Sequence, residues 1–185
     1  MKKLRARISW VLLVVFGGLC AWIYWPRDPA IVVIERAGGT VQRLTAGPDA
    51  GAYAVTLPDT VGDEDLERMS ALDKLRPVWL QLRGRQISGR GLVAVTRLDY
   101  LHGITFYGSK ITDEDLVHLR AFPELGMVNL DCNLITDAGL KHFNEMPKLK
   151  CVSLRGNPIT AKGVQKLQAD RPDLIVYSQH EPPDD

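Results

Sequence analysis

The sequence lacks the short motifs that identify common catalytic centres. It has no G-x-S-x-G nucleophile turn, no Walker loop for phosphate and no H-E-x-x-H zinc motif. Its one regularly spaced histidine pair is His118 and His142, and no cysteine or carboxylate recurs beside them to complete the three or four ligands of a zinc site. We therefore expect no enzyme activity, no cofactor and no metal centre.

An excess of charge of one sign is also missing. The formal net charge is +1, and the four basic residues before Ile8 account for all of that excess. Without them, 19 Lys and Arg residues stand against 22 Asp and Glu residues. Because nucleic-acid binding generally needs a basic face, we expect no nucleic-acid partner.

Long apolar runs are scarce, and the clearest one lies near the N-terminus. Residues 8–25 form a stretch of eighteen residues without a charge, which is long enough for a helix to cross a bilayer. Aromatic residues, which favour the membrane interface, lie near its ends: Trp10, Trp22, Tyr24 and Trp25. The segment before the run is basic: Lys2, Lys3, Arg5 and Arg7. Since basic flanks stay in the cytoplasm, we predict a cytoplasmic segment 1–7, a single-pass transmembrane signal-anchor helix 8–25 and an extracytoplasmic remainder.

A cleaved signal peptide is the alternative for this segment, because the apolar run is short for a membrane span. Cleavage sites usually have small residues at alternate positions, and no such pair precedes Trp25. Bulky aromatic residues occupy that place instead. The sequence therefore favours an uncleaved anchor.

The most regular feature of the chain is a 24-residue spacing in its second half. Isoleucine returns at this interval at Ile87, Ile111, Ile135 and Ile159. Two further apolar columns keep the spacing, at position four (Leu80, Ile104, Val128 and Val152) and at position six (Leu82, Phe106, Leu130 and Leu154) of each copy. Such a period is typical of a solenoid, in which each copy buries its apolar face against its neighbours.

The best copy begins at Leu125 and reads L-x-x-V-x-L-x-x-N-x-I, which resembles the leucine-rich repeat family. The segment Ile135–Leu140 is similar to the linker of the ribonuclease-inhibitor-like or cysteine-containing-like subclass, and the anchor suggests a bacterial membrane-anchored type. The resemblance implies an α/β solenoid with parallel strands on a concave face and short helices on a convex face. It covers residues 52–177: a degenerate copy 52–76, full copies 77–100, 101–124, 125–148 and 149–173, and a terminal strand 174–177.

Local chemistry agrees with this arrangement. Strand side chains alternate, so positions four and six point to one side, and asparagine at position nine can bond the backbone of the following turn. A Ser or Thr follows each isoleucine column and is suited to cap a helix, while the nearby Asp and Glu residues favour the positive end of that helix. Proline then ends the helices at Pro123, Pro147 and Pro172. Each full copy is therefore expected to contain one strand and one short helix.

Two flanking segments and the cysteines complete the organisation. Residues 26–51 are predicted to form a helix and strand that cap the first copy, and residues 178–185 a disordered acidic tail. Cys132 and Cys151 occupy positions eight and three of adjacent copies, too far apart for a disulfide. We expect both to be partly buried free thiols.

The expected function is carried by the strand face that the helices leave open. Positions three, five and seven of each copy should point to this concave face, because they alternate with the buried positions. The predicted binding residues are Trp79, Gln81, Arg83, Thr105, Tyr107, Asn129, Asp131, Ser153 and Arg155. Aromatic and arginine side chains are frequent in binding hot spots, so we expect a non-catalytic module that recognises a protein, peptide or glycan. The alternative is a structural envelope component that associates with itself.

Overall fold

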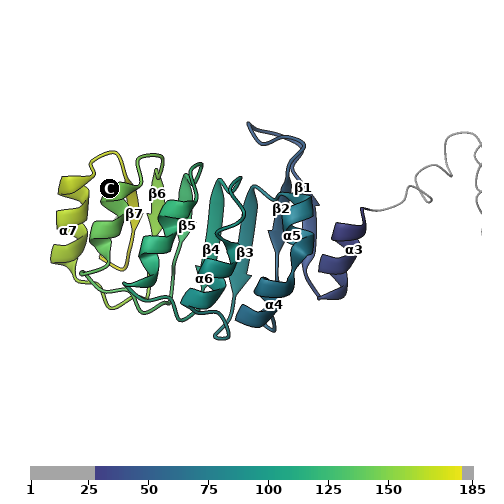
Figure 1. The fold of residues 1–185 in the computed structure, drawn as a ribbon. Helices are drawn as coiled ribbons and strands as arrows, with labels where there is room; N and C mark the ends of the chain where they lie inside the picture. The colour runs from purple at the N-terminus through teal and green to yellow at the C-terminus, as the bar shows by residue number, and fades with distance from the viewer. Residues whose placement is uncertain (1–27, 181–185) are drawn as a thin grey trace, which may run out of the picture.

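The computed structural model describes residues 28–180 and has an α/β fold built on one seven-stranded, mostly parallel sheet (Figure 1). This confirms the predicted α/β class. The strands are β1 (Thr40–Arg43), β2 (Tyr53–Thr56), β3 (Trp79–Arg83), β4 (Gly103–Tyr107), β5 (Met127–Asn129), β6 (Cys151–Ser153) and β7 (Ile175–Tyr177). The predicted membrane span 8–25 lies outside the described residues. Within residues 28–180, no helix combines the length and apolarity that a membrane crossing requires.

The spatial order of the strands equals their order in the sequence. β1 and β2 form an antiparallel hairpin, and every later strand pairs in parallel with the strand before it. From β3 to β7 the register advances by one 24-residue copy at each step, so Trp79, Gly103, Met127, Cys151 and Ile175 are partners in turn. The chain therefore advances by one strand with each copy.

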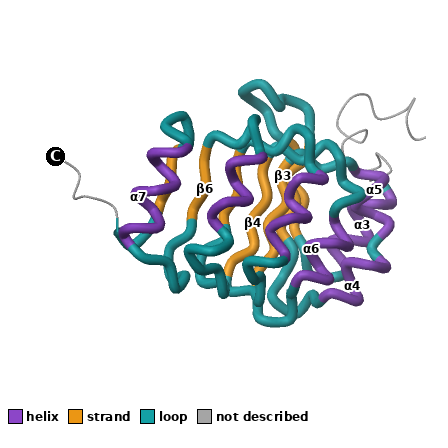
Figure 2. Tube along the Cα trace, turned by 60° about the vertical axis from the view of Figure 1, so that its left-hand side comes forward, coloured by secondary structure: helices purple, strands orange, loops and turns teal. Residues whose placement is uncertain are grey.

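Helical segments cover one side of the sheet and leave the other side without a helix (Figures 1 and 2). They are α3 (Pro29–Arg36), α4 (Asp63–Arg68), α5 (Ser70–Leu75), α6 (Gly89–Val95), the 3-10 helices η1 (Asp115–Ala121) and η2 (Leu140–Glu145), and α7 (Ala161–Asp170). We call the uncovered side the open strand face. The core lies between the helices and the sheet, where the apolar columns at positions four, six and eleven are all buried.

The helical segments that follow β4 and β5 are of a different type from those that follow β3 and β6. α6 and α7 are α-helices, but the copies 101–124 and 125–148 contain the 3-10 helices η1 and η2. A 3-10 helix rises about 2.0 Å per residue against about 1.5 Å for an α-helix, so a few residues cover more of the strand beneath. Six or seven residues, ending before Pro123 and Pro147, thus span the available length.

The turn that follows each strand is held by position nine in the C-terminal copies. The Asn133 side chain accepts a hydrogen bond from Ile111 N (3.1 Å) and donates to Phe106 O (2.7 Å) and Leu130 O (2.9 Å). Asn157 repeats these contacts with Ile135 N (3.1 Å) and Leu130 O (2.8 Å). Both asparagines are buried, so their hydrogen bonds satisfy backbone groups that water cannot reach.

Carboxylates near the helix starts act between copies rather than only on their own helices. Asp113 accepts from the backbone N (2.8 Å) and hydroxyl (2.6 Å) of Thr136, and Asp137 does the same with Thr160 (2.8 and 2.6 Å). A side chain at Gly163 would collide with Asp137, so glycine makes room for the contact. We call each such contact an Asp–Thr bridge. Of the predicted caps, Ser88 and Thr160 begin α6 and α7, whereas Thr112 and Thr136 precede 3-10 helices whose first turns they do not cap.

The chain remains attached to the last copy beyond β7. Ser178 is buried, the Gln179 side chain donates to Asn157 O (2.8 Å), and His180 Nε2 lies 3.0 Å from Ile159 O. These three residues were expected in the disordered tail, but they extend the turn pattern of the preceding copies. Residues 181–185 lie outside the described part of the chain.

Candidate functional site

Seven of the nine predicted binding residues lie in the strands β3 to β6, whereas Asp131 and Arg155 lie in the turns after β5 and β6. Trp79 is only partly exposed, because its ring lies over Gly103, where an added Cβ would overlap it. Its indole Nε1 donates to Asp49 Oδ2 (3.2 Å), and the other oxygen of Asp49 lies 2.7 Å from His102 Nδ1. The loop that joins β1 to β2 is thereby attached to the face. Trp79 therefore has a structural role that the sequence did not indicate.

A polar cluster occupies the centre of the face. Asp131 Oδ1 accepts from Ser153 Oγ (2.6 Å) and from Arg155 N (2.9 Å), and Asp131 N donates to Asn129 Oδ1 (3.0 Å). All of these side chains except that of Arg155 are half-buried. Three of the predicted binding residues, Asn129, Asp131 and Ser153, thus bond one another, and they fix the geometry of β5 and β6.

The most accessible predicted residues are Gln81, Arg83, Tyr107 and Arg155. Tyr107 is 49% exposed, and the Arg155 guanidinium lies 5.3 Å from the ring centroid of Tyr177. Gln81 accepts from Thr56 Oγ1 (3.2 Å), and Thr105 is half-buried between its neighbours. Aromatic and guanidinium groups are therefore presented to solvent along most of the face.

Three exposed residues on this face were not among the predicted binding residues, although Met127 belongs to a column that the sequence places there. Met127 and Ile175 belong to the position-three column and are 42% and 56% exposed, and Tyr177 is 40% exposed. The periodic spacing could have found them, since each continues a column already identified. Their exposure adds apolar area to a face otherwise recognised by its aromatic and charged side chains.

An open groove of about 670 Å³ lies where β2, β3 and β4 end. It is lined by the predicted residues Arg83 and Tyr107 and by Arg85, which sequence reasoning did not select. Arg85 occupies position nine, where the later copies have the buried Asn133 and Asn157, yet it is exposed. The groove therefore forms at the place where the turn asparagine is replaced.

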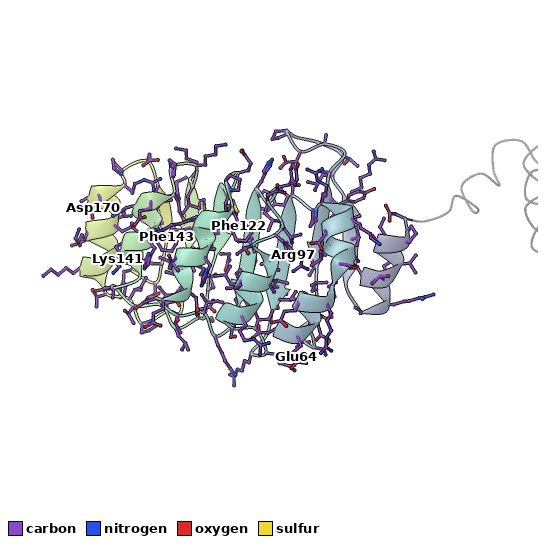
Figure 3. All side chains as sticks on the ribbon, viewed as in Figure 1. Glu64, Arg97, Phe122, Lys141, Phe143 and Asp170 are labelled. Carbon is purple, nitrogen blue, oxygen red and sulfur yellow. The ribbon has the colours of Figure 1, made fainter. Side chains whose placement is uncertain are left out.

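The helical side has a different chemistry. A cavity of about 350 Å³ between η2 and α7 is lined by charged residues that include Lys141, Lys162 and Asp170. Lys141 and Asp170 are on this side in Figure 3. Asp170 pairs with Lys166 at 2.5 Å. This exposed pair is of the kind that contributes little to stability.

Titratable groups on the helical side show only local effects. Burial, together with the charges of Lys141 and Arg120, lowers the pKa of His142, whose Nδ1 is 3.2 Å from the Arg120 guanidinium. Hydrogen bonds from Arg171 and Lys150 hold the pKa of Asp173 well below its usual range. Among the residues that the structure describes, no three His, Cys, Asp or Glu residues are placed to hold a metal ion.

The two cysteines in the described part of the chain are free. Cys151 is half-buried, and burial raises the pKa of its thiol. Cys132 is exposed rather than partly buried, and it has a positive φ of 58°. The corresponding position is glycine in the other copies, with φ of 107° at Gly84, 64° at Gly108 and 71° at Gly156. Cys132 therefore has a left-handed backbone conformation, which glycine adopts more easily.

No protein-family model matches this sequence, and no curated protein is significantly similar to it. The functional argument therefore depends on the chain's own residues and their geometry.

Proposed function

We propose that this chain is a leucine-rich repeat solenoid, anchored in the membrane by residues 8–25, that recognises a protein or peptide through its concave strand face without catalysing a reaction. The constant 24-residue register from β3 to β7 supports the repeat assignment. The open strand face corresponds to the concave face of such a solenoid. Repeat proteins commonly bind partners along this extended surface.

The observation that carries the proposal is the exposure of Arg83, Tyr107 and Arg155 on a face that no described helix covers. Small polar side chains, such as those of Thr105 and Ser153, would be enough to cover the strand backbone on this face. Large aromatic and guanidinium groups combine apolar area with directed hydrogen bonds, which is the chemistry of binding hot spots. The four adjacent strands β3 to β6 extend over about 15 Å, given strand spacings of about 4.8 Å. That length suits a peptide or a protein edge.

A photo-crosslinking experiment in envelope membranes tests the face. A benzophenone amino acid is placed at Tyr107 on the strand face, and in a control at Lys141 on the helical side. We expect a discrete adduct from position 107 and none from position 141. Adducts that form only from position 141 would move the binding surface to the helices and contradict the proposal.

Self-association is the second candidate, because the last strand exposes apolar side chains at the end of the sheet. Ile175 and Tyr177 are 56% and 40% exposed, and β7 has no neighbouring strand on its outer edge among the described residues. The same crosslinking experiment separates the two functions. An adduct with twice the 20.6 kDa mass of the chain indicates self-association, whereas another mass indicates a different partner.

The proposed topology has its own test. Basic residues before the apolar run predict a cytoplasmic N-terminus and an extracytoplasmic repeat domain. Protease added to intact spheroplasts should therefore digest the repeats. Complete protection until the cells are lysed would contradict this orientation.

A further inference from the structure

The groove at the ends of β2, β3 and β4 has an uncompensated positive charge. Arg83 and Arg85 both line it, and neither guanidinium has a hydrogen-bond or ion-pair partner among residues 28–180. Asp59 is the only carboxylate among the lining residues, and it bonds neither arginine. By contrast, two described arginines on the helical side are bound within the fold: Arg97 to Asp73 (2.6 Å) and Arg171 to Asp173 (2.9 Å). The two groove arginines are thus left available to an external anion.

The side chain at position 85 lacks the hydrogen bonds to turn backbone that the later copies make at this position. Asparagine at this position bonds three backbone groups in the copy of Asn133, whereas the Arg85 side chain points into the groove and makes none of these bonds. The neighbouring Ser109 is buried, and its hydroxyl has no partner among the described residues. Losses of turn hydrogen bonds are therefore concentrated beside the groove.

The remaining lining favours a peptide over a phosphate group. The backbone N–H groups of Gly84 and Gly108 are already bonded, to Tyr107 O (3.0 Å) and Asp131 O (3.0 Å), so these two glycine amides are not available for a phosphate-binding nest. Tyr107 and Pro58 supply apolar surface beside the arginines. A guanidinium binds a carboxylate through two parallel hydrogen bonds, and the apolar surface can contact the stem of an acidic side chain.

We propose that this groove binds an acidic peptide segment of the partner, with Arg83 and Arg85 contacting its carboxylates and Tyr107 packing against its side-chain stems. This inference rests on the proposed function, because it names the partner chemistry of one part of the strand face. The segment lies against the C-terminal ends of the strands, and it contacts neither the clamped Trp79 nor the helical side.

Fluorescence anisotropy with the full chain in mild detergent tests the proposal. The probes are rhodamine-labelled peptides of four Glu-Ser repeats and, as the uncharged match, four Gln-Ser repeats. We expect the acidic peptide to bind at least about tenfold more tightly than the neutral one, and the pair Arg83→Gln with Arg85→Gln to remove at least that factor, since loss of a single charged contact commonly costs about tenfold.

A matched control removes the same two charges elsewhere. Arg36 and Lys141 are exposed on α3 and η2, and their change to Gln alters the net charge equally. Affinity for the acidic peptide should stay within about twofold of the unchanged chain, because these charges lie outside the groove. Equal loss in both pairs would show that binding is a general charge effect and would overturn the site.

Two further outcomes would also overturn the proposal. One is equal binding of the two peptides, and the other is tight binding of a sulfated heparin fragment through Arg83 and Arg85 while the acidic peptide fails to bind. Circular dichroism of each variant checks that the exposed substitutions leave the fold intact. If crosslinking still occurs at Tyr107 but the acidic peptide does not bind, the strand-face function stands and this inference alone fails.

Discussion

The copies at the two ends of the sheet use the same apolar core but different polar contacts. In residues 125–177, position nine is a buried asparagine with at least three hydrogen bonds. Carboxylate bridges between copies occur in both regions: Asp113 to Thr136 and Asp137 to Thr160, and in the N-terminal region Asp63 to Ser88 (2.9 and 2.5 Å). In residues 77–124, position nine is the exposed Arg85 and then the unbonded Ser109. The C-terminal copies are therefore the regular scaffold, whereas the N-terminal copies depart from it beside the groove.

One departure in the N-terminal copies is repaired locally. The residue that should provide an Asp–Thr bridge to Thr112 is Gly89. Asp115 of the same copy as Thr112 takes over, accepting from its backbone N (2.9 Å) and hydroxyl (2.8 Å). A side chain at Gly89 would overlap the Asp115 carboxylate, so the position of Asp115 requires glycine at residue 89. At position nine, by contrast, the Arg85 side chain makes no hydrogen bond to the described turn backbone and lines the groove.

The largest expected effect concerns the core that the two regions share. Leu82 and Leu130 are both fully buried at position six, so Leu→Ala at either site should lower the free energy of unfolding by about 2 to 5 kcal/mol. Because each copy contacts mainly its neighbours, damage at Leu130 should be concentrated in the C-terminal copies. Denaturant unfolding with hydrogen exchange measures both. A change below about 1 kcal/mol at Leu130 would contradict the assigned core position.

The turn asparagine should separate the two regions. Asn133→Ala leaves Ile111 N and Phe106 O without this partner, whereas Leu130 O keeps its hydrogen bond from Asn157. The change should cost about 3 kcal/mol, because buried unsatisfied groups cost about 1 to 3 kcal/mol each. Ser109→Ala removes an unbonded hydroxyl, so it should be neutral or stabilise slightly. Thermal and denaturant unfolding of both variants make the comparison. Equal losses would show that position nine is equivalent in the two regions.

The compensated pair at the start of α6 and η1 gives a smaller effect. Gly89→Asp alone should destabilise by about 1 to 3 kcal/mol, because the new side chain competes with Asp115 for one space. Adding Asp115→Gly should restore most of this loss by recreating the bridge seen in the later copies. Melting temperatures of the single and double variants test the coupling. Additive losses would refute the shared-space explanation.

The pH dependence of one Asp–Thr bridge is the smallest expected effect. Hydrogen bonds from Thr160 lower the pKa of Asp137 below its ordinary value of 3.8. A carboxyl with a depressed pKa stabilises the fold above its unfolded pKa, and this contribution is lost as the pH falls through the lower folded pKa. Asp137→Asn should therefore be less stable than the unchanged chain at pH 7, and the difference should shrink below about pH 4. Unfolding at several pH values, with the unbonded Asp99→Asn as control, measures it. A difference independent of pH would contradict a charge-based contact.

The sequence predicted the parts of the structure that depend on period. Position four and six residues such as Leu80 and Phe106 are buried as expected, because alternation along a strand fixes which side chains face the helices. The cap helix also begins as predicted, with the Asp28 side chain accepting from Ala30 N (2.8 Å) and Pro29 in the first turn. Both results follow from neighbours close in the sequence.

Contacts between distant residues were missed. Asp113 was expected to stabilise its own helix start, but its partner Thr136 lies in the next copy. Trp79 was expected on a free surface, yet Asp49 reaches it from the loop before β2. Neither contact can be derived from the 24-residue period or from local helix and strand propensity. Arg85 was missed for a different reason: its significance lies in what the other copies have at that position and in the groove beside it.

The central claim is that the irregular N-terminal copies maintain a binding groove at the expense of turn hydrogen bonds. Arg85→Asn tests it most directly, because it restores the residue that the later copies use. We expect the free energy of unfolding to stay the same or rise by about 1 kcal/mol, while affinity for the peptide of four Glu-Ser repeats falls about tenfold. Unchanged peptide affinity together with a loss of stability would show that Arg85 serves the fold, and would contradict the account.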